Sequence, residues 1–174
     1  MGSLTGKKVL VVLAPKDFRD EEYFISRVAL QANGAQIVTV SKGIEEATGI
    51  KGGKVKIDFE LDDIKIADYE AIVFVGGKGA AGYFKNKKVL DLARNFAEKE
   101  KVIGAICIAP TILANAGILK GKKATSYSSE KSKLVSKGAK FTGAEVQQDG
   151  KIITASGPKA SNEFGKKLAE VLAN

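Results

Sequence analysis

The sequence contains no histidine and no tryptophan, and it has only one cysteine and one methionine. The absence of histidine removes the usual base of a catalytic thiol. A single cysteine excludes an intramolecular disulfide, so the core must hold the fold together, and it favours a cytoplasmic location. The longest apolar run, residues 9–14, is far too short to cross a bilayer. We therefore expect no membrane association.

Acidic residues are also fewer than basic ones. The chain has 20 aspartates and glutamates against 28 lysines and arginines, which gives a net charge of +8. The excess is almost entirely lysine, and the lysines are spread among acids instead of gathering with aromatic residues as in nucleic-acid grooves. This pattern predicts a solvated surface and no specific nucleic-acid partner. With 174 residues, 44% of them hydrophobic, the chain is expected to form a single domain over residues 1–174.

Strand and helix signals alternate along the whole chain. Short apolar runs predict strands at residues 8–14, 36–40, 54–57, 71–75 and 102–106, with a hairpin of 144–147 and 152–155. Helical patterns cover 21–32, 89–99, 111–116 and 158–172, whereas 43–53 is a glycine-rich excursion. In the first helix, the stripe of Phe24, Ile25, Val28 and Ala29 is expected to face the core.

This alternation predicts an α/β fold with a mostly parallel sheet between two helical layers. Ligand sites of such sheets lie beyond the carboxyl ends of the strands. Three loops occupy that position, at residues 15–22, 76–82 and 107–110. We expect them to lie side by side, provided that the strands at 8–14, 71–75 and 102–106 are neighbours.

Cys107 ends the apolar run 101–107 and precedes a helix. At a strand-to-helix junction, converging backbone N–H groups and the helix dipole favour a thiolate. The sequence therefore predicts a reactive thiol with a lowered pKa. From the pattern alone, a buried core cysteine is an equally good interpretation.

Two further features have positions that suit a site around this thiol. The loop 77–82 matches the dinucleotide pattern G-x-G-x-x-G, but Cys107 stands where the ribose-binding acid belongs, so we reject that interpretation. Gly76 and Gly77 instead predict a tight turn with N–H groups facing the thiol, although a plain glycine turn fits as well. Glu22 begins the first helix, and partial burial there predicts a raised pKa and a hydrogen bond with the sulfur.

The segment Gly-Ala-Ile-Cys-Ile-Ala-Pro-Thr at 104–111 resembles the nucleophile elbow of the PfpI / parkinsonism-deglycase ("DJ-one") superfamily. Residues 18–22, 75–77 and 149–158 are similar to further segments of that family. The resemblance implies a class I glutamine amidotransferase-like, flavodoxin-like three-layer sandwich, usually dimeric. It also implies Cys107 as nucleophile, Glu22 as its carboxyl partner and the N–H groups of Gly77 and Ile108 as oxyanion donors. Gly76 and Tyr127 would lie in the pocket.

The expected function is a weak glyoxalase acting on small 2-oxoaldehydes such as methylglyoxal. The alternatives are a cysteine redox sensor or stress chaperone, and a degenerate member in which Ile108 shields the thiol. Peptidase activity is not expected, because Ile108 follows the cysteine where the peptidase branch has histidine. The expected partners are a small aldehyde or oxidant and a second copy of the chain, with no metal and no cofactor.

Overall fold

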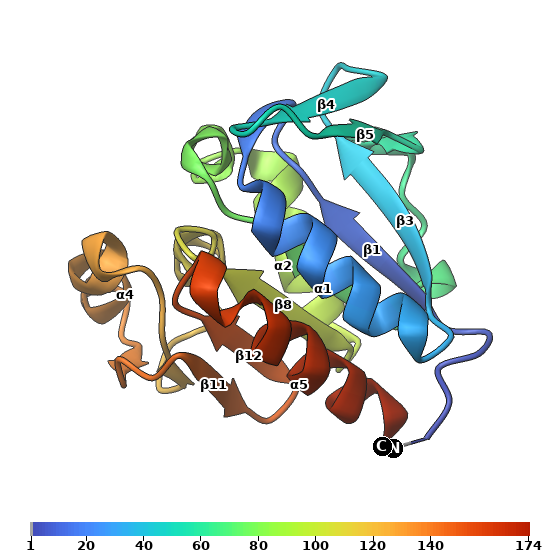
Figure 1. The fold of residues 1–174 in the computed structure, drawn as a ribbon. Helices are drawn as coiled ribbons and strands as arrows, with labels where there is room; N and C mark the ends of the chain where they lie inside the picture. Colours follow the sequence, from blue (N-terminus) through green and yellow to red (C-terminus); the bar gives the residue numbers. More distant parts are fainter. Residues whose placement is uncertain (1) are drawn as a thin grey trace.

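A seven-stranded sheet forms the centre of the computed structural model, which describes residues 2–174 (Figure 1). The strands follow the order β11-β12-β8-β7-β1-β3-β6, and every neighbouring pair is parallel except β11 with β12. Their bounds are β1 (Lys8–Val12), β3 (Gln36–Ser41), β6 (Phe59–Glu60), β7 (Ala71–Phe74), β8 (Val102–Ile106), β11 (Val146–Asp149) and β12 (Ile152–Ala155). The predicted α/β fold with a mostly parallel sheet is confirmed.

Helices cover both faces of the sheet, which explains why its central strands are almost continuously apolar. Figure 1 shows α1 (Asp20–Ala32) and α5 (Ser161–Ala173) side by side on one face. The other face is covered by α2 (Lys87–Glu98), α3 (Pro110–Asn115) and α4 (Lys131–Ser136). Successive β1 residues alternate between the two core layers, Val9 packing with α1 and α5 and Leu10 with α2 and α3.

Helix α1 presents a different face to the core from the one predicted. Its buried apolar side chains are Tyr23 and Leu30, whereas Ile25 and Val28 are 39% and 61% exposed. The prediction for Ile25 and Val28 is therefore wrong. The reason is the close packing of α1 on α5, where a Cβ at Gly165 would lie 2.8 Å from Ala29 Cβ. This contact turns the polar positions of α1 inward and two large aliphatic side chains outward.

The segment 43–53 is more regular than predicted. It contains β4 (Glu46–Gly49), which joins β2 (Lys16–Phe18) and β5 (Lys54–Lys56) in a small separate sheet. The buried Asp20 carboxylate accepts hydrogen bonds from the N–H groups of Lys51 and Gly53, both at 2.8 Å. A buried acid thus ties the glycine-rich turn to the start of α1. A second small sheet pairs β9 (Lys123–Ala124) with β10 (Lys140–Phe141).

Gly2 and the end of α5 lie together at the amino edge of the central sheet (Figure 1). Gly2 is close enough to Ala173 that a Cβ at Gly2 would contact its carbonyl oxygen at 3.6 Å. The predicted hairpin forms with its turn at Gly150, so its first strand is shifted by two residues from the predicted one. Within residues 2–174, no helix combines the length and the apolar character needed to cross a membrane.

Candidate active site

Strand order brings the three predicted loops together. β1, β7 and β8 are neighbours in the sheet, and all three run in the same direction. The loops that follow them, 15–22, 76–82 and 107–110, therefore meet at one carboxyl edge. They are tied to one another, since the Arg19 N–H donates to the Gly76 carbonyl at 2.9 Å. The expected adjacency is confirmed.

Cys107 occupies a sharp turn between β8 and α3. Its φ of 66° lies in the left-handed region, which few non-glycine residues adopt, and its side chain is 8% exposed. Two hydrogen bonds hold this backbone: the Cys107 N–H donates to the Ala155 carbonyl at 2.9 Å, and the Tyr127 N–H donates to the Cys107 carbonyl at 2.8 Å. Such strained backbone persists only where the surroundings enforce it. The turn is therefore a built feature and has the geometry of a nucleophile elbow.

Glu22 is the carboxyl group nearest to this turn. It belongs to the first turn of α1 and is fully buried. Its Oε1 accepts a hydrogen bond from the Gly76 N–H at 2.9 Å. Its Oε2 meets no nitrogen or oxygen donor, which leaves the Cys107 thiol as the hydrogen-bonding group beside it. The structure thus brings the two predicted side chains into direct contact.

Burial dominates the proton affinity of this pair. Desolvation raises the pKa of Glu22 from 4.5 to about 7, against the opposing hydrogen bonds of Cys107 and Gly76. Desolvation, followed by the charge of Glu22, raises the pKa of Cys107 from 9.0 to about 12. The prediction of a lowered thiol pKa is therefore wrong for the free protein. Between these two values the pair holds one proton, which Glu22 is placed to receive from the sulfur.

This arrangement predicts an unusual pH dependence of thiol reactivity. Alkylation of Cys107 by iodoacetamide should rise about tenfold per pH unit up to about pH 7, where Glu22 loses its proton, and then level off. An isolated thiol would keep rising to its own pKa of about 8.5. The rate of mass gain between pH 5 and 10 measures this profile. A single rise centred above pH 8 would contradict the assigned coupling.

Two positions beside the thiol, Gly76 and Gly77, must be glycine because the neighbouring atoms leave no room for a side chain. A Cβ at Gly76 would lie 2.6 Å from Glu22 Oε1 and 2.7 Å from Cys107 Cβ. Gly77 has a φ of 97°, and a Cβ there would lie 2.4 Å from the Arg19 nitrogen. The N–H groups of Gly77 and Ile108 hydrogen-bond to the sulfur and favour its anionic form. Three of the groups expected around the thiol therefore hydrogen-bond to it, namely the Glu22 carboxyl and the N–H groups of Gly77 and Ile108, whereas the Gly76 N–H is bonded to Glu22.

Gly76→Ala is expected to destabilise the fold by at least about 2 kcal/mol, because the added methyl overlaps the Ile106 carbonyl, a backbone atom that cannot move aside. Gly82→Ala is the matched control, since a Cβ at Gly82 meets nothing within 4 Å. Its free energy of unfolding should stay within about 0.5 kcal/mol of that of the parent. Urea denaturation of both variants measures the difference. Equal stabilities would show that the site is looser than described.

A cleft of about 740 Å³ lies at the same edge of the sheet. Tyr127, predicted to be a pocket residue, lines it and is 50% exposed. Gly76 does not line the cleft but contacts Glu22 from below the surface. Tyr127 is the one lining residue that the sequence reasoning placed at the site, and both cations of the cleft, Arg19 and Lys159, were missed. The position of Arg19, directly before the helix that carries Glu22, is the signal that identifies it.

A cavity behind Glu22, lined by Val73 and Val75 among others, has a volume of only about 10 Å³, too small for a substrate. Another cavity, of about 540 Å³, is at the opposite edge of the sheet and is lined by Lys101, Asp149 and Lys151 among others. Within residues 2–174 there is no group of three or more histidine, cysteine, aspartate or glutamate side chains arranged to hold a metal ion. The carboxyl-edge cleft is thus the one associated with Cys107.

Comparison with known proteins gives a consistent result. The family model described as the DJ-1/PfpI family matches residues 7–171. An uncharacterized protein of Methanocaldococcus jannaschii is 40% identical over 98% of this chain and 84% of its own length. A deglycase of Pyrococcus horikoshii is 31% identical (95% and 99% covered). The glutathione-independent glyoxalase DJR-1.2 of Caenorhabditis elegans is 28% identical (95% and 89%).

The fold agrees with these sequence relationships. The crystal structure of a ThiJ/PfpI domain protein from Brachyspira murdochii superposes with a TM-score of 0.94 at 30% identity, covering 97% of each chain. Drosophila melanogaster DJ-1beta superposes with a TM-score of 0.88 at 32% identity, covering 97% of this chain and 91% of its own. The matches span the elbow, the Glu22 helix and the C-terminal helix together. This chain therefore belongs to the DJ-1/PfpI family.

Proposed function

We propose that the protein is a cysteine-dependent glyoxalase that converts small 2-oxoaldehydes such as methylglyoxal into 2-hydroxy acids. The observation that carries this proposal is the contact between the Cys107 thiol and the buried Glu22, whose pKa is raised to about 7. A carboxyl group of this kind both accepts and returns protons near neutral pH. Relatives named as a glyoxalase and as deglycases support the same class of chemistry.

The reaction needs no group beyond this pair and water. The ionised Glu22 takes the thiol proton as sulfur adds to the aldehyde carbon, which gives a hemithioacetal after the oxygen is protonated. Glu22 then removes the hydrogen of that carbon as a proton, which gives an enediol, and returns it to the neighbouring carbon. The hydroxyl proton of the first carbon passes to the former carbonyl oxygen, which leaves the thioester of a 2-hydroxy acid. Water hydrolyses the thioester to the hydroxy acid and restores the thiol. The N–H groups of Gly77 and Ile108 are placed to stabilise the oxyanions.

The test is the formation of lactate from methylglyoxal without glutathione or any added cofactor. We expect multiple turnovers per protein molecule, lost when Cys107 has first been alkylated by iodoacetamide. Alkylation is a suitable control because the chain has only one cysteine. Lactate formation at the rate of a protein-free solution, or equal formation by alkylated protein, would contradict the proposal.

A redox-sensing role is the second candidate, and the same contact favours it. Two successive oxidations by peroxide convert a thiol to a sulfinate, and a protonated Glu22 together with two N–H groups would hold that anion. The intact mass after mild peroxide distinguishes the two roles. A stable gain of two oxygens on Cys107 supports the sensor, and its absence counts against it.

A stress-chaperone role would be tested by measuring whether the protein suppresses the aggregation of an unfolded client protein, with the thiol intact and with the thiol oxidised.

We further propose that the protein forms a homodimer through the outer face of α1. Ile25 and Val28 are exposed there, and with Ala29 they line a shallow hollow of about 470 Å³ against α5. The Arg27 guanidinium stacks on Tyr23 at 5.2 Å and has no acidic partner within residues 2–174. An exposed apolar patch beside an unpaired charge is typical of a protein interface.

Sedimentation equilibrium tests this assembly. We expect twice the chain mass for the parent protein and a monomer for Val28→Asp, because a charge would be placed at the centre of the patch. Lys65→Asp, at an exposed position outside the patch, is the control. A monomeric parent would refute the proposal.

We also propose a cytoplasmic location, because the chain has a single thiol and therefore no partner for an intramolecular disulfide.

A further inference from the structure

The cleft beside Cys107 has an unbalanced set of charges. Two cations line it, Arg19 and Lys159, and the one acid among its lining residues is Glu21. Glu21 is already shared, because its Oε2 lies 3.2 Å from the Arg19 guanidinium and 3.0 Å from Lys51 Nζ. Lys51 thus offsets the single negative charge of the wall. The cleft retains an excess of positive charge that no ion pair within residues 2–174 neutralises.

Arg19 is held in place by its backbone and retains free donor capacity. Its N–H is bonded to Gly76, and its side chain is 33% exposed with a buried Nε that has no hydrogen-bond partner. The single bond to Glu21 leaves most of the planar donor fork open. Forks of this geometry suit carboxylate and phosphate oxygens. Lys159 shares the cleft and makes no ion pair with any residue in the described range 2–174.

The charge of Arg19 also reaches the reacting pair. It lowers the pKa of the buried Glu22, so the guanidinium and the carboxyl interact electrostatically. The cleft is joined to the elbow by the Tyr127 N–H, which donates to the Cys107 carbonyl at 2.8 Å. An anionic group seated on Arg19 and Lys159 would therefore occupy the cleft whose Tyr127 wall is bonded to the Cys107 backbone, with Ser126 and Ser156 among the other lining residues.

We infer that the substrate of Cys107 is an anionic 2-oxoaldehyde, in which a phosphate or carboxylate on the side chain binds Arg19 and Lys159 while the aldehyde faces the sulfur. This inference rests on the proposed glyoxalase function and specifies its substrate class. Neutral methylglyoxal leaves both cations unused. The overall conversion is balanced by water alone, as for the neutral substrate, because the anionic group takes no part in bond breaking.

The first experiment does not depend on turnover. Iodoacetate and iodoacetamide are near-isosteric, and they differ by one negative charge. Relative to a free thiol, Cys107 should prefer iodoacetate by about fivefold for each cleft cation, which is the effect of unit charges several ångströms apart at intermediate dielectric. Arg19→Gln and Lys159→Gln should each remove one such factor from the iodoacetate-to-iodoacetamide ratio. In 1 M salt, where the Debye length is about 3 Å, the preference should largely disappear.

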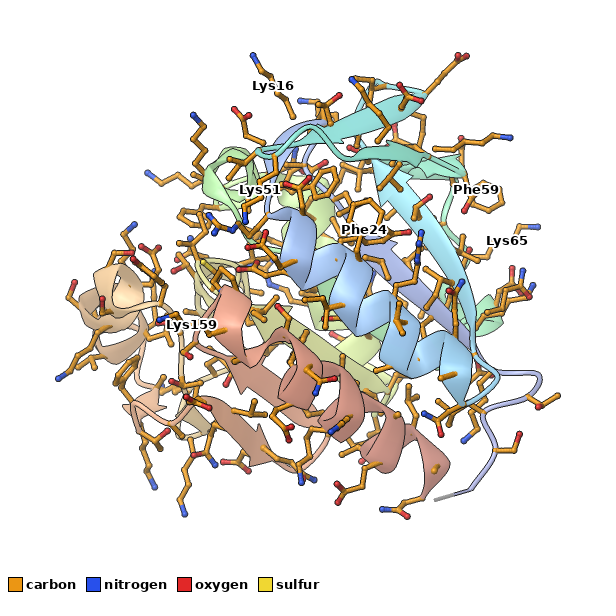
Figure 2. The ribbon with its side chains drawn as sticks, viewed as in Figure 1. Lys16, Phe24, Lys51, Phe59, Lys65 and Lys159 are labelled. Carbon is orange, nitrogen blue, oxygen red and sulfur yellow. The ribbon has the colours of Figure 1, made fainter. Side chains whose placement is uncertain are left out.

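Lys65→Gln is the matched control. It removes the same charge from the opposite side of the molecule (Figure 2), so the ratio should not change. A parent ratio equal to that of a free thiol, or equal ratios in parent, Arg19→Gln and Lys159→Gln, would overturn the inference and leave the glyoxalase proposal standing. Failure of both reagents to alkylate the native thiol would overturn the two together. Should Arg19→Gln not fold, the outcome is decided by Lys159→Gln.

The second experiment distinguishes the two sources of the anionic group. The three probes differ in the substituent on the methyl carbon of methylglyoxal. The first carries a phosphate ester, the second a carboxymethyl group and the third, which is neutral, a hydroxyl group. We expect kcat/KM for the preferred anion to exceed that for the neutral analogue at least tenfold, and Lys159→Gln to reduce this excess by about fivefold. An equal kcat/KM for all three would contradict the inference.

Discussion

Replacing Cys107 with serine is expected to lower kcat/KM for methylglyoxal by roughly 10³-fold or more. A serine hydroxyl is a far weaker acid and nucleophile than a thiol, and the only carboxyl beside it, Glu22, ionises near pH 7. Glu22 can therefore take the proton of the more acidic thiol far more readily than that of a hydroxyl group. No histidine elsewhere in the chain is available to take over that role.

The Cys107 variant separates chemistry from folding. Serine keeps the size of the side chain and the hydrogen bonds of the elbow backbone, so the thermal midpoint should stay within a few degrees of that of the parent. Lactate formation, measured alongside thermal unfolding, gives both quantities. Turnover within tenfold of the parent in a folded variant would exclude a covalent role for the sulfur.

Glu22→Gln is expected to affect activity and stability in opposite directions. Loss of the proton carrier should lower kcat by about 10²- to 10⁴-fold, the usual range for a general acid–base group. The raised pKa of Glu22 means that the folded state holds its proton more tightly than the unfolded chain. Its contribution to stability is fully present below pH 4.5 and is lost as the pH rises through about 7.

At pH 8 the glutamine variant should therefore be more stable than the parent by about 3 kcal/mol, which corresponds to the rise in pKa from 4.5 to about 7. At pH 4 the two proteins should be equally stable. Urea denaturation at both pH values measures this difference. Glu163→Gln, an exposed acid at the start of α5, is the control and should show no such dependence on pH. A parent protein more stable than Glu22→Gln at pH 8 would show that burial does not disfavour the ionised form of Glu22.

Most of the central sheet could be predicted from local pattern. The runs 9–14 and 102–106 contain no polar or charged side chain, which is typical of a strand covered on both faces. The placement of Cys107 between such a strand and a helix could also be predicted, and the resemblance to the family identified this junction as an elbow. The adjacency of the strands at 8–14, 71–75 and 102–106 entered only as a hypothesis, because local pattern does not determine the order of strands in a sheet.

Features that depend on packing across the molecule could not be predicted. Helix α1 carries apolar residues on two faces, and periodicity does not say which one the sheet covers; Tyr23 and Leu30 are buried, and Val28 is not. The strands β9 and β10 have two residues each, too few to leave a pattern. The thiol pKa depends on burial, and a local argument from the helix dipole gave the wrong sign.

The meeting of both chain ends at the amino edge of the sheet has a practical consequence. Gly2 and Ala173 lie close together, and the cleft lies at the other end of the strands. A short linker could join the ends, and the chain could be reopened at the exposed hairpin turn at Gly150. Such a circular permutant would keep every core contact. Likewise, a protein tethered to a surface by either terminus would present its thiol outward, toward the solution.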